Sequence, residues 1–368
     1  MTRTLDLALG DRSDVPGVAT RDLGEVRRAF VEWFAGHLST QDIEATDLDV
    51  RLTSFAGGGY SNEIIFVDAS YVDRGAPRTR RLVLRLPPDG PSLFPSYDLA
   101  MQVAVQEAVG RHGVPVPQPV TLESDERWLG TPFLVMPRVD GHNTGELPVA
   151  DPWLAAADVD QQRALQEGFL DALAQIHRTP WQGQPVAAHL RGAGATLASE
   201  VRWWEELTAW TFDGEPPSAL VAAFSWCREH LPAEEPPASV LWGDVRLGNV
   251  IFDDEFAPVA VLDWEMASIG PAELDLAWYT ALDGMTEHFF GQRVEGFLTR
   301  DEIVARHETA LGRPLVDMAW FEIFAMCRST ALNLRTDRLE SYRRGKPPRS
   351  TDGHPVLTYT LDRIASIS

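Results

Sequence analysis

Residues 241–267 read LWGDVRLGNVIFDDEFAPVAVLDWEMA, and this stretch decides which fold the sequence predicts. Two short runs of β-forming residues, VIF and VAVLDW, lie between turn-forming Gly and Asp residues. Asp244 is followed five positions later by Asn249, and Asp263 stands near the end of the second run. The stretch therefore predicts a small hairpin whose loops present two carboxylates and an amide.

These polar side chains match what phosphoryl transfer needs. That reaction requires a base for the attacking hydroxyl, oxygen ligands for Mg²⁺, and positive charge near the phosphoryl group. Asp244 is the predicted catalytic base, Asn249 and Asp263 are the predicted metal ligands, and Arg246 is the predicted catalytic cation. The competing interpretation is that these residues only cap turns and strand ends. Because all four occur in register beside apolar runs, the catalytic interpretation is favoured.

The chain around this stretch divides into a β-rich part and a helical part. Residues 1–22 are predicted as an N-terminal extension, 23–138 as an ATP-binding N-lobe, and 139–368 as a C-lobe. The C-lobe contains the predicted catalytic loop at 242–249 and the predicted metal-binding segment at 261–265. The predicted fold class is α+β, namely a protein-kinase-like two-lobed fold with a β-rich N-lobe, one key helix, and a mainly helical C-lobe.

Apolar spacing gives the expected elements. Strands are expected on both sides of the glycine run at 57–59, at 80–88, and twice within 126–142. The tail after Leu339 is rich in Arg, Pro and Ser and carries no expected element. Helices are expected at 23–40, 96–112, 159–178, 197–211, 217–231, 273–283, 301–311 and 316–335.

The segments LWGDVRLGNVIF (241–252) and AVLDWEMASIGPAELDLAW (260–278) resemble the phosphotransferase family that includes aminoglycoside and choline kinases. Within it, the chain is most similar to the subgroup related to the kinase-like domain fused to some acyl-CoA dehydrogenases. The resemblance covers about Leu23–Arg338 and implies that Asp275 supports the catalytic loop. The alternative is an acid that only interacts with the helix dipole. Glu265 is a further supporting candidate, and its favoured role is as a partner in a structural salt bridge.

The resemblance also places nucleotide-binding residues along the N-lobe. Arg85 stands where kinases carry a phosphate-binding lysine, and the single lysine of the chain, Lys346, lies far downstream. A guanidinium can grip phosphates bidentately. The glycine run can expose backbone N–H groups to phosphates, although a plain hairpin turn explains it equally well. The nucleotide-binding candidates are Gly57, Gly58, Gly59, Tyr60, Ser61, Asn62, Arg85, Gln102, Met136 and Arg138.

Two positions depart from the family pattern. Gln102 stands where a Glu usually pairs with the phosphate-binding residue, and Glu107 is the fallback partner of Arg85. Trp242 precedes Gly243-Asp244 where many members have His, and a Trp can pack and donate one N–H.

The predicted acceptor is a small-molecule hydroxyl, with C-lobe helices 200–231 and 301–338 as acceptor-binding elements. The formal charge of −22 disfavours nucleic acid and suits a cationic acceptor. An aminoglycoside-like acceptor is favoured. The alternatives are a metabolic kinase of a hydroxy acid or hydroxyacyl-CoA, and a nucleotide-binding pseudokinase that regulates a partner. Trp203 and Trp204 fit either core packing or a substrate wall.

Composition adds cofactor and compartment expectations. ATP or GTP with Mg²⁺ is expected, and oligomeric state is not indicated by the sequence. Only two cysteines occur, so a disulfide framework is not expected. No run approaches the ~20 apolar residues that span a membrane, and the first residues do not match a signal peptide. A cytoplasmic protein without a membrane partner is therefore expected.

Overall fold

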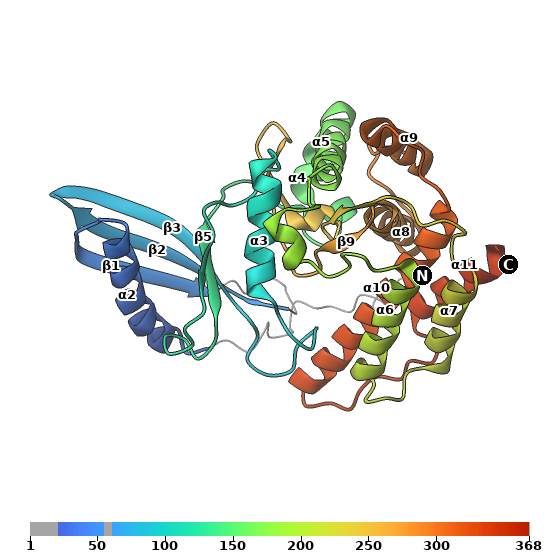
Figure 1. The fold of residues 1–368 in the computed structure, drawn as a ribbon, viewed down its shortest axis with the longest axis horizontal. Helices are drawn as coiled ribbons and strands as arrows, with labels where there is room; N and C mark the ends of the chain where they lie inside the picture. Colours follow the sequence, from blue (N-terminus) through green and yellow to red (C-terminus); the bar gives the residue numbers. More distant parts are fainter. Residues whose placement is uncertain (1–20, 55–60, 368) are drawn as a thin grey trace. The chain divides into compact units, whose positions relative to one another are not determined.

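The computed structural model describes residues 21–54 and 61–367, and Figure 1 shows their helices and strands. The described residues form two compact units. Residues up to 103 together with 117–139 form the sheet unit, and 104–116 together with 140–367 form the helical unit. The predicted functional division into an N-lobe and a C-lobe stays a prediction.

In the described part of the sheet unit, five antiparallel strands pair in the order β1-β2-β3-β5-β4. Strands β2 and β3 stay in continuous register and are joined by Arg74-Gly75, both with positive φ, as a tight hairpin requires. The strands are β1 (Ala45–Ser54), β2 (Glu63–Asp73), β3 (Ala76–Leu86), β4 (Thr121–Glu123) and β5 (Phe133–Pro137).

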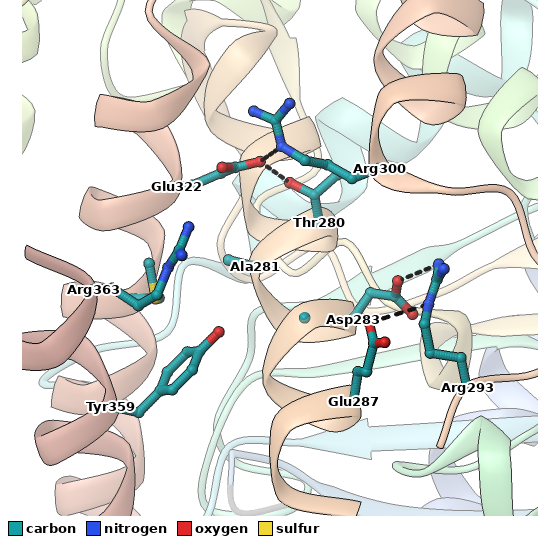
Figure 2. A pocket seen from close by; sticks show the side chains of 11 residues that line it. Thr280, Ala281, Asp283, Glu287, Arg293, Arg300, Glu322, Tyr359 and Arg363 are labelled. Carbon is teal, nitrogen blue, oxygen red and sulfur yellow. Dashed lines mark hydrogen bonds and ion pairs between the residues drawn. The ribbon is translucent and has the colours of Figure 1, made fainter. Parts of the chain in front are cut away.

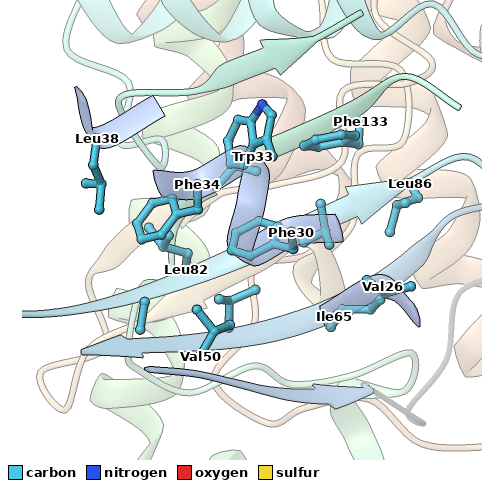
Figure 3. Packing of buried hydrophobic residues seen from close by; sticks show 14 of the residues in the cluster. Val26, Phe30, Trp33, Phe34, Leu38, Val50, Ile65, Leu82, Leu86 and Phe133 are labelled. Atoms are coloured by element: carbon cyan, nitrogen blue, oxygen red, sulfur yellow. The ribbon is translucent and has the colours of Figure 1, made fainter. Parts of the chain in front are cut away.

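Helix α2 (Leu23–Thr40) covers one face of this sheet. Its buried side chains recur at helical spacing, and Figure 3 shows Phe30, Trp33 and Phe34 against apolar side chains of the strands. Asp22 caps the helix by accepting a 2.8 Å hydrogen bond from the Glu25 N–H. The predicted helix at 23–40 is therefore confirmed, and its apolar side packs with the strands in a hydrophobic core of the sheet unit.

The strands expected within 126–142 are only half right. Residues 133–137 form β5, but the other strand lies earlier, at β4. The intervening segment is a turn, in which the Gly130 N–H donates to the Glu126 carbonyl at 2.7 Å. Local turn bonds thus replace the expected ladder bonds around Trp128.

The helical unit consists mainly of helices. The predicted helices at 273–283 and 316–335 are present but longer, since α8 (Glu273–Phe290) continues to a left-handed cap at Gly291 and α10 (Met318–Arg343) continues to Arg343. Helix α3 (Leu99–Arg111) has residues in both units. The others are α4 (Pro152–Ala156), α5 (Val159–His177), α6 (Leu197–Thr211), α7 (Ser218–Glu229), α9 (Arg300–Leu311) and α11 (Pro355–Ile367).

The tail contains a helix that the sequence analysis did not predict. Helix α11 buries Val356, Leu357 and Thr360 and packs against α10 and α7. The Thr360 and Thr330 hydroxyls lie 3.0 Å apart in the interior. The amphipathic spacing of residues 355–367 could have indicated this helix, but the Arg- and Pro-rich segment before the helix obscured that signal.

Two strand pairs in the helical unit carry the expected hairpin. Strands β7 (Val250–Phe252) and β8 (Pro258–Val261) pair as predicted from the two apolar runs. Strands β6 (Ala238–Leu241) and β9 (Ser268–Pro271) form a second pair around them. The loops that contain Asp244 and Asp263 therefore start and end on paired strands.

Two further sequence expectations concern thiols and membrane spans. Both cysteines are buried free thiols, with their sulfurs 3.8 Å apart between α7 and α10. None of the described helices combines the length and apolar character that a bilayer crossing needs.

Candidate active site

Asp244 lies at the centre of the candidate site, in the loop between β6 and β7. Its Oδ2 accepts hydrogen bonds from Arg246 Nε and Asn249 Nδ2, both at 2.8 Å. Its Oδ1 accepts a 3.2 Å bond from the indole N–H of Trp278 on α8. The side chain is 17% exposed. Three donors therefore fix the orientation of a carboxylate that solvent still reaches.

The surroundings of Asp244 make its carboxylate a stronger proton acceptor than an ordinary Asp. Burial raises the pKa of Asp244, and the charges of Asp263 and Glu146 act in the same direction. Arg246 and the hydrogen bond from Asn249 oppose the shift without reversing it. A raised pKa favours uptake of a proton from a hydroxyl.

Asp263 is brought to the same place by the turn after β8. Its backbone has a φ of 59°, an uncommon conformation for a residue other than glycine. Its charge acts on both Asp244 and Arg246. The structure thus brings together the four residues that the sequence singled out, including Asn249.

The donor set fits a hard divalent cation. Both bonds donated by Asn249 Nδ2 go to Asp244, to the backbone oxygen at 3.1 Å and to Oδ2 at 2.8 Å. Its Oδ1 is then the atom suited to a cation, together with the carboxylate of Asp263, whose charge acts on Asp244. Across residues 21–54 and 61–367, no group of three or more His, Cys, Asp or Glu side chains could hold a metal ion. The Mg²⁺ ligand set stays a prediction.

Arg246 is held between two carboxylates. Its Nε binds Asp244, and its Nη1 pairs with Glu146. Although burial opposes the charged form, Asp244 and Glu146 raise the pKa of Arg246 overall. The guanidinium is therefore a permanent positive charge beside the candidate base.

Helix α8 is tied to the loop through Asp275. Its buried carboxylate accepts the Trp242 N–H at 2.7 Å and the Gly243 N–H at 3.0 Å. Gly243 has a φ of 94°, and a Cβ there would lie 2.3 Å from the Met266 carbonyl oxygen. His177 Nε2 lies 3.2 Å from the same carboxylate. Asp275 thus bonds directly to the backbone that precedes Asp244.

Trp242 links the two functional loops. Its indole N–H lies 2.8 Å from the Leu262 carbonyl and 3.1 Å from the Asp263 carbonyl. The ring is buried near Phe169 and Trp264. The Trp that departs from the family pattern therefore uses its one donor to connect the loop of Asp244 to the turn of Asp263.

Four nucleotide-binding candidates, namely Gly57, Gly58, Gly59 and Tyr60, are outside the described residues, and the others lie in the sheet unit. Ser61 and Asn62 are buried at the start of the described segment. Met136 is buried on β5, and the Arg138 guanidinium lies 4.3 Å from the centre of the Phe66 ring. Their roles stay predictions.

Arg85 and its predicted partners lie on different elements. Arg85 is buried on β3, and Gln102 is buried on α3. Glu107, the fallback partner, is exposed and forms an i,i+4 ion pair with Arg111 at 3.7 Å. Glu265 is half-buried beside the predicted metal-binding Asp263, and its role also stays a prediction.

The two tryptophans on α6 differ in exposure. Trp204 is fully buried and donates its N–H to Glu200 at 3.2 Å. Trp203 is half-buried, with the Arg191 guanidinium 4.1 Å from its ring centre. Trp204 therefore belongs to the core.

Sequence reasoning missed several residues that contact this loop. Trp278 lies three positions after Asp275, so a helical register drawn from Asp275 could have indicated it. Asn143 Nδ2 donates to the carbonyls of Gly248 and Val250, at 2.7 and 3.0 Å. Neither Asn143 nor Glu146 carries any local signal.

A cavity of about 160 Å³ lies elsewhere in the helical unit, and Figure 2 shows side chains that line it. Its main ion pairs are internal, Arg293 with Asp283 and Arg300 with Glu322, both at 2.7 Å. Ligand sites commonly enclose roughly 300–1,000 Å³. This small, internally neutralised cavity contains none of the predicted site residues. Its lining is Thr280, Ala281, Asp283, Gly284, Glu287, Arg293, Arg300, Glu322, Met326, Tyr359 and Arg363.

Comparison with known families decides the classification. The sequence pattern described as "Phosphotransferase enzyme family" matches residues 53–311, more than half of the chain. The chain belongs to this family. The predicted family membership is confirmed, and the match includes the loops of Asp244 and Asp263.

Curated relatives of this phosphotransferase carry acyl-CoA dehydrogenase names. Human acyl-CoA dehydrogenase family member 11 is 31% identical over 199 residues, which is 54% of this chain and 25% of that protein. Mouse acyl-CoA dehydrogenase family member 10 is 28% identical over 248 residues, 67% of this chain and 22% of that protein. The chain thus spans about a quarter of each relative, and the predicted relation to this subgroup is confirmed.

Solved structures with the same fold include proteins described as aminoglycoside phosphotransferases. A Ralstonia eutropha protein, provisionally described as an aminoglycoside phosphotransferase, has a TM-score of 0.66 at 20% identity and covers 92% of this chain and 98% of its own. A GDP complex of an aminoglycoside 2′-phosphotransferase-IIIa mutant has a TM-score of 0.51 at 15% identity, covering 91% and 98%. These similarities confirm the predicted protein-kinase-like α+β fold of the phosphotransferase.

Proposed function

We propose that this phosphotransferase moves the γ-phosphate of ATP or GTP to a hydroxyl of a small molecule, with Asp244 as the general base. The observation that carries the proposal is that Arg246, Asn249 and Asp263 converge around the carboxylate of Asp244. A purely structural cluster would not need a base, a permanent cation, an amide and a second carboxylate together.

In this proposal, each residue of the site has a separate role in phosphoryl transfer. Asp244 accepts the proton of the acceptor hydroxyl. The hydroxyl oxygen bonds to the γ-phosphorus as the nucleoside diphosphate leaves. Arg246 offsets charge that develops on the transferred group. Asn249 Oδ1 and the Asp263 carboxylate would hold Mg²⁺, which would supply positive charge for the phosphate groups. Trp278 keeps Asp244 Oδ1 oriented.

Nucleotide recognition is proposed for the sheet unit. Arg85 is the residue proposed to hold the phosphates, and Gln102 is its proposed partner. Backbone groups near Met136 and Arg138 are proposed to contact the nucleotide base. The GDP complex of the solved relative supports a purine nucleotide as the phosphoryl donor.

For the acceptor we favour a cationic, aminoglycoside-like molecule. The chain carries a formal charge of −22, which raises the local concentration of cations. The structural relatives that are named aminoglycoside phosphotransferases support the same class. A KM that rises with ionic strength is the expected signature of such an acceptor.

A hydroxyacyl-CoA or hydroxy acid is the second candidate. Its support is specific, because the curated relatives carry acyl-CoA dehydrogenase names. The acidic chain works against an anionic CoA, so this acceptor would bind more tightly as ionic strength rises.

The test is a nucleotide-consumption screen of aminoglycosides and hydroxyacyl-CoAs, with Asp244→Asn as the blank. We expect the variant to bind nucleotide normally while kcat falls roughly 10²–10⁴-fold. Calorimetry measures binding, and a coupled assay measures turnover.

Wild-type turnover by Asp244→Asn would refute the base assignment. Tight nucleotide binding without turnover on any acceptor would instead favour the pseudokinase alternative. The sign of the salt effect on KM separates the two acceptor classes.

A further inference from the structure

Arg328 is a buried arginine that the proposed reaction leaves without a role. It lies on α10 and is 3% exposed. Its Nη2 approaches the Gly243 carbonyl at 3.4 Å, and its Nε has no hydrogen-bond partner among the described residues. A buried guanidinium with so few hydrogen bonds requires another source of stabilisation.

Aromatic rings provide that stabilisation. The guanidinium carbon lies 4.8 Å from the ring centre of Trp278 and 4.9 Å from that of Trp204, with Phe324 at 5.8 Å. Cation–π contacts of this kind strengthen when the cation is desolvated. Arg328 is thus held by ring faces more than by hydrogen bonds.

One of the rings in contact with Arg328, that of Trp278, also bonds to the candidate base. Trp278 presents its ring to Arg328 and its N–H to Asp244 Oδ1, at 3.2 Å. The Gly243 carbonyl, which faces Arg328, belongs to the residue just before Asp244. One side chain therefore contacts both the backbone and the indole that orient this carboxylate.

The charge of Arg328 persists in this position. Burial lowers the pKa of Arg328 to about 10, while the carboxylates of Glu200 and Asp275 counteract the shift. The residue remains a cation at neutral pH. A planar guanidinium can stack between rings, whereas a lysine ammonium cannot match that geometry.

We propose that Arg328 is a positioning residue of the transfer reaction, acting on Asp244 through the Trp278 ring and the Gly243 carbonyl. The inference rests on the proposed function of Asp244. It adds that the stack of Trp204, Arg328 and Trp278 keeps the carboxylate in its reactive orientation.

The kinetic test is a double-mutant cycle. We expect Arg328→Lys to lower kcat about 10- to 100-fold, because small displacements of a reacting group are costly. KM for nucleotide should change by less than about twofold, since ground-state binding is untouched. Trp278→Phe keeps an aromatic ring, although a smaller one, and removes the N–H. The double variant should have a kcat no lower than that of the less active single variant, because both substitutions act through the orientation of the Asp244 carboxylate.

The matched control is another arginine of the helical unit. Arg313 forms a two-bond pair with the fully buried Glu273, at 2.6 and 2.9 Å. Arg313→Lys should lower the melting temperature without changing kcat per folded molecule. If Arg328→Lys behaves like Arg313→Lys, or if the cycle effects multiply, Arg328 only stabilises the fold and the inference is wrong.

A second measurement does not depend on turnover. The indole N–H of Trp278 can be assigned in tryptophan-labelled protein by its absence from Trp278→Phe. Arg328→Lys should speed its hydrogen exchange at least about tenfold, whereas Arg313→Lys should not. Unchanged exchange would overturn the inference even if no acceptor is found. Full turnover by Asp244→Asn would remove the proposed base and with it the kinetic role of Arg328, whereas the exchange rates would still show separately whether Arg328 holds the Trp278 indole.

Discussion

At the scale of single residues, the clearest unused titratable group is His307 on α9. It is 1% exposed, and its Nε2 lies 2.8 Å from Nδ1 of His177, which in turn contacts Asp275. Burial, followed by the neighbouring His177, lowers the pKa of His307 to about 2. The folded protein therefore keeps this imidazole neutral where an unfolded chain would protonate it.

This depressed pKa predicts a pH-dependent stability. The unfolded imidazole titrates near pH 6.5, so the stability that His307 contributes is complete above that pH. It is lost as pH falls below 6.5, at about 1.4 kcal/mol per pH unit. In His307→Gln, which can still bond His177, the unfolding free energy should rise less steeply from pH 4 to 6.5. Urea titrations of both proteins measure this, and parallel curves would contradict it.

At the scale of elements, α8 is the helix on which the loop geometry depends. Asp275 in its first turn takes two backbone N–H groups, and Trp278 one turn later bonds Asp244. An asparagine at 275 would turn an N–H toward one of those donors. The helix would then hold the loop by a single accepted bond.

Asp275→Asn should therefore lower the unfolding free energy by about 1–3 kcal/mol, the cost of one unsatisfied buried N–H. It should also lower kcat. Asp158→Ala is the control, since this exposed N-cap of α5 accepts from Gln161 and its loss should cost about 1 kcal/mol without changing kcat. Denaturation and turnover assays would show the difference. Equal behaviour of the two variants would mean that α8 does not hold the loop.

At the scale of the whole molecule, a ligand that binds only the folded state stabilises the entire chain. We expect Mg²⁺ with ATP or GTP at one hundred times Kd to raise the unfolding free energy by about 2.7 kcal/mol. Thermal melts with and without EDTA measure the share that depends on the metal. Asp263→Asn should lose that share, while Asp244→Asn should keep it. Equal stabilisation in EDTA would show that Asp263 holds no metal.

Much of the fold was predictable because its signals are local. Helical spacing placed α2, α5 and α6 to within a residue or so, and the two apolar runs placed β7 and β8. The strand expected near Trp128 failed because turn bonds within a few residues outcompete a short ladder. Helix α11 was missed because proline and arginine just before it dominate the composition.

The sequence by itself determined the family and the convergence of Asp244, Asn249 and Asp263, because their spacing beside two paired strands leaves one arrangement. Only the tertiary structure decided what holds them there. Glu146 meets Arg246 across 100 positions, and Arg328 meets Gly243 across 85. Such partners are chosen by the packing of distant helices and loops. Local periodicity shows which side of a helix a residue occupies, but it carries no information about the ring or carbonyl that the residue meets.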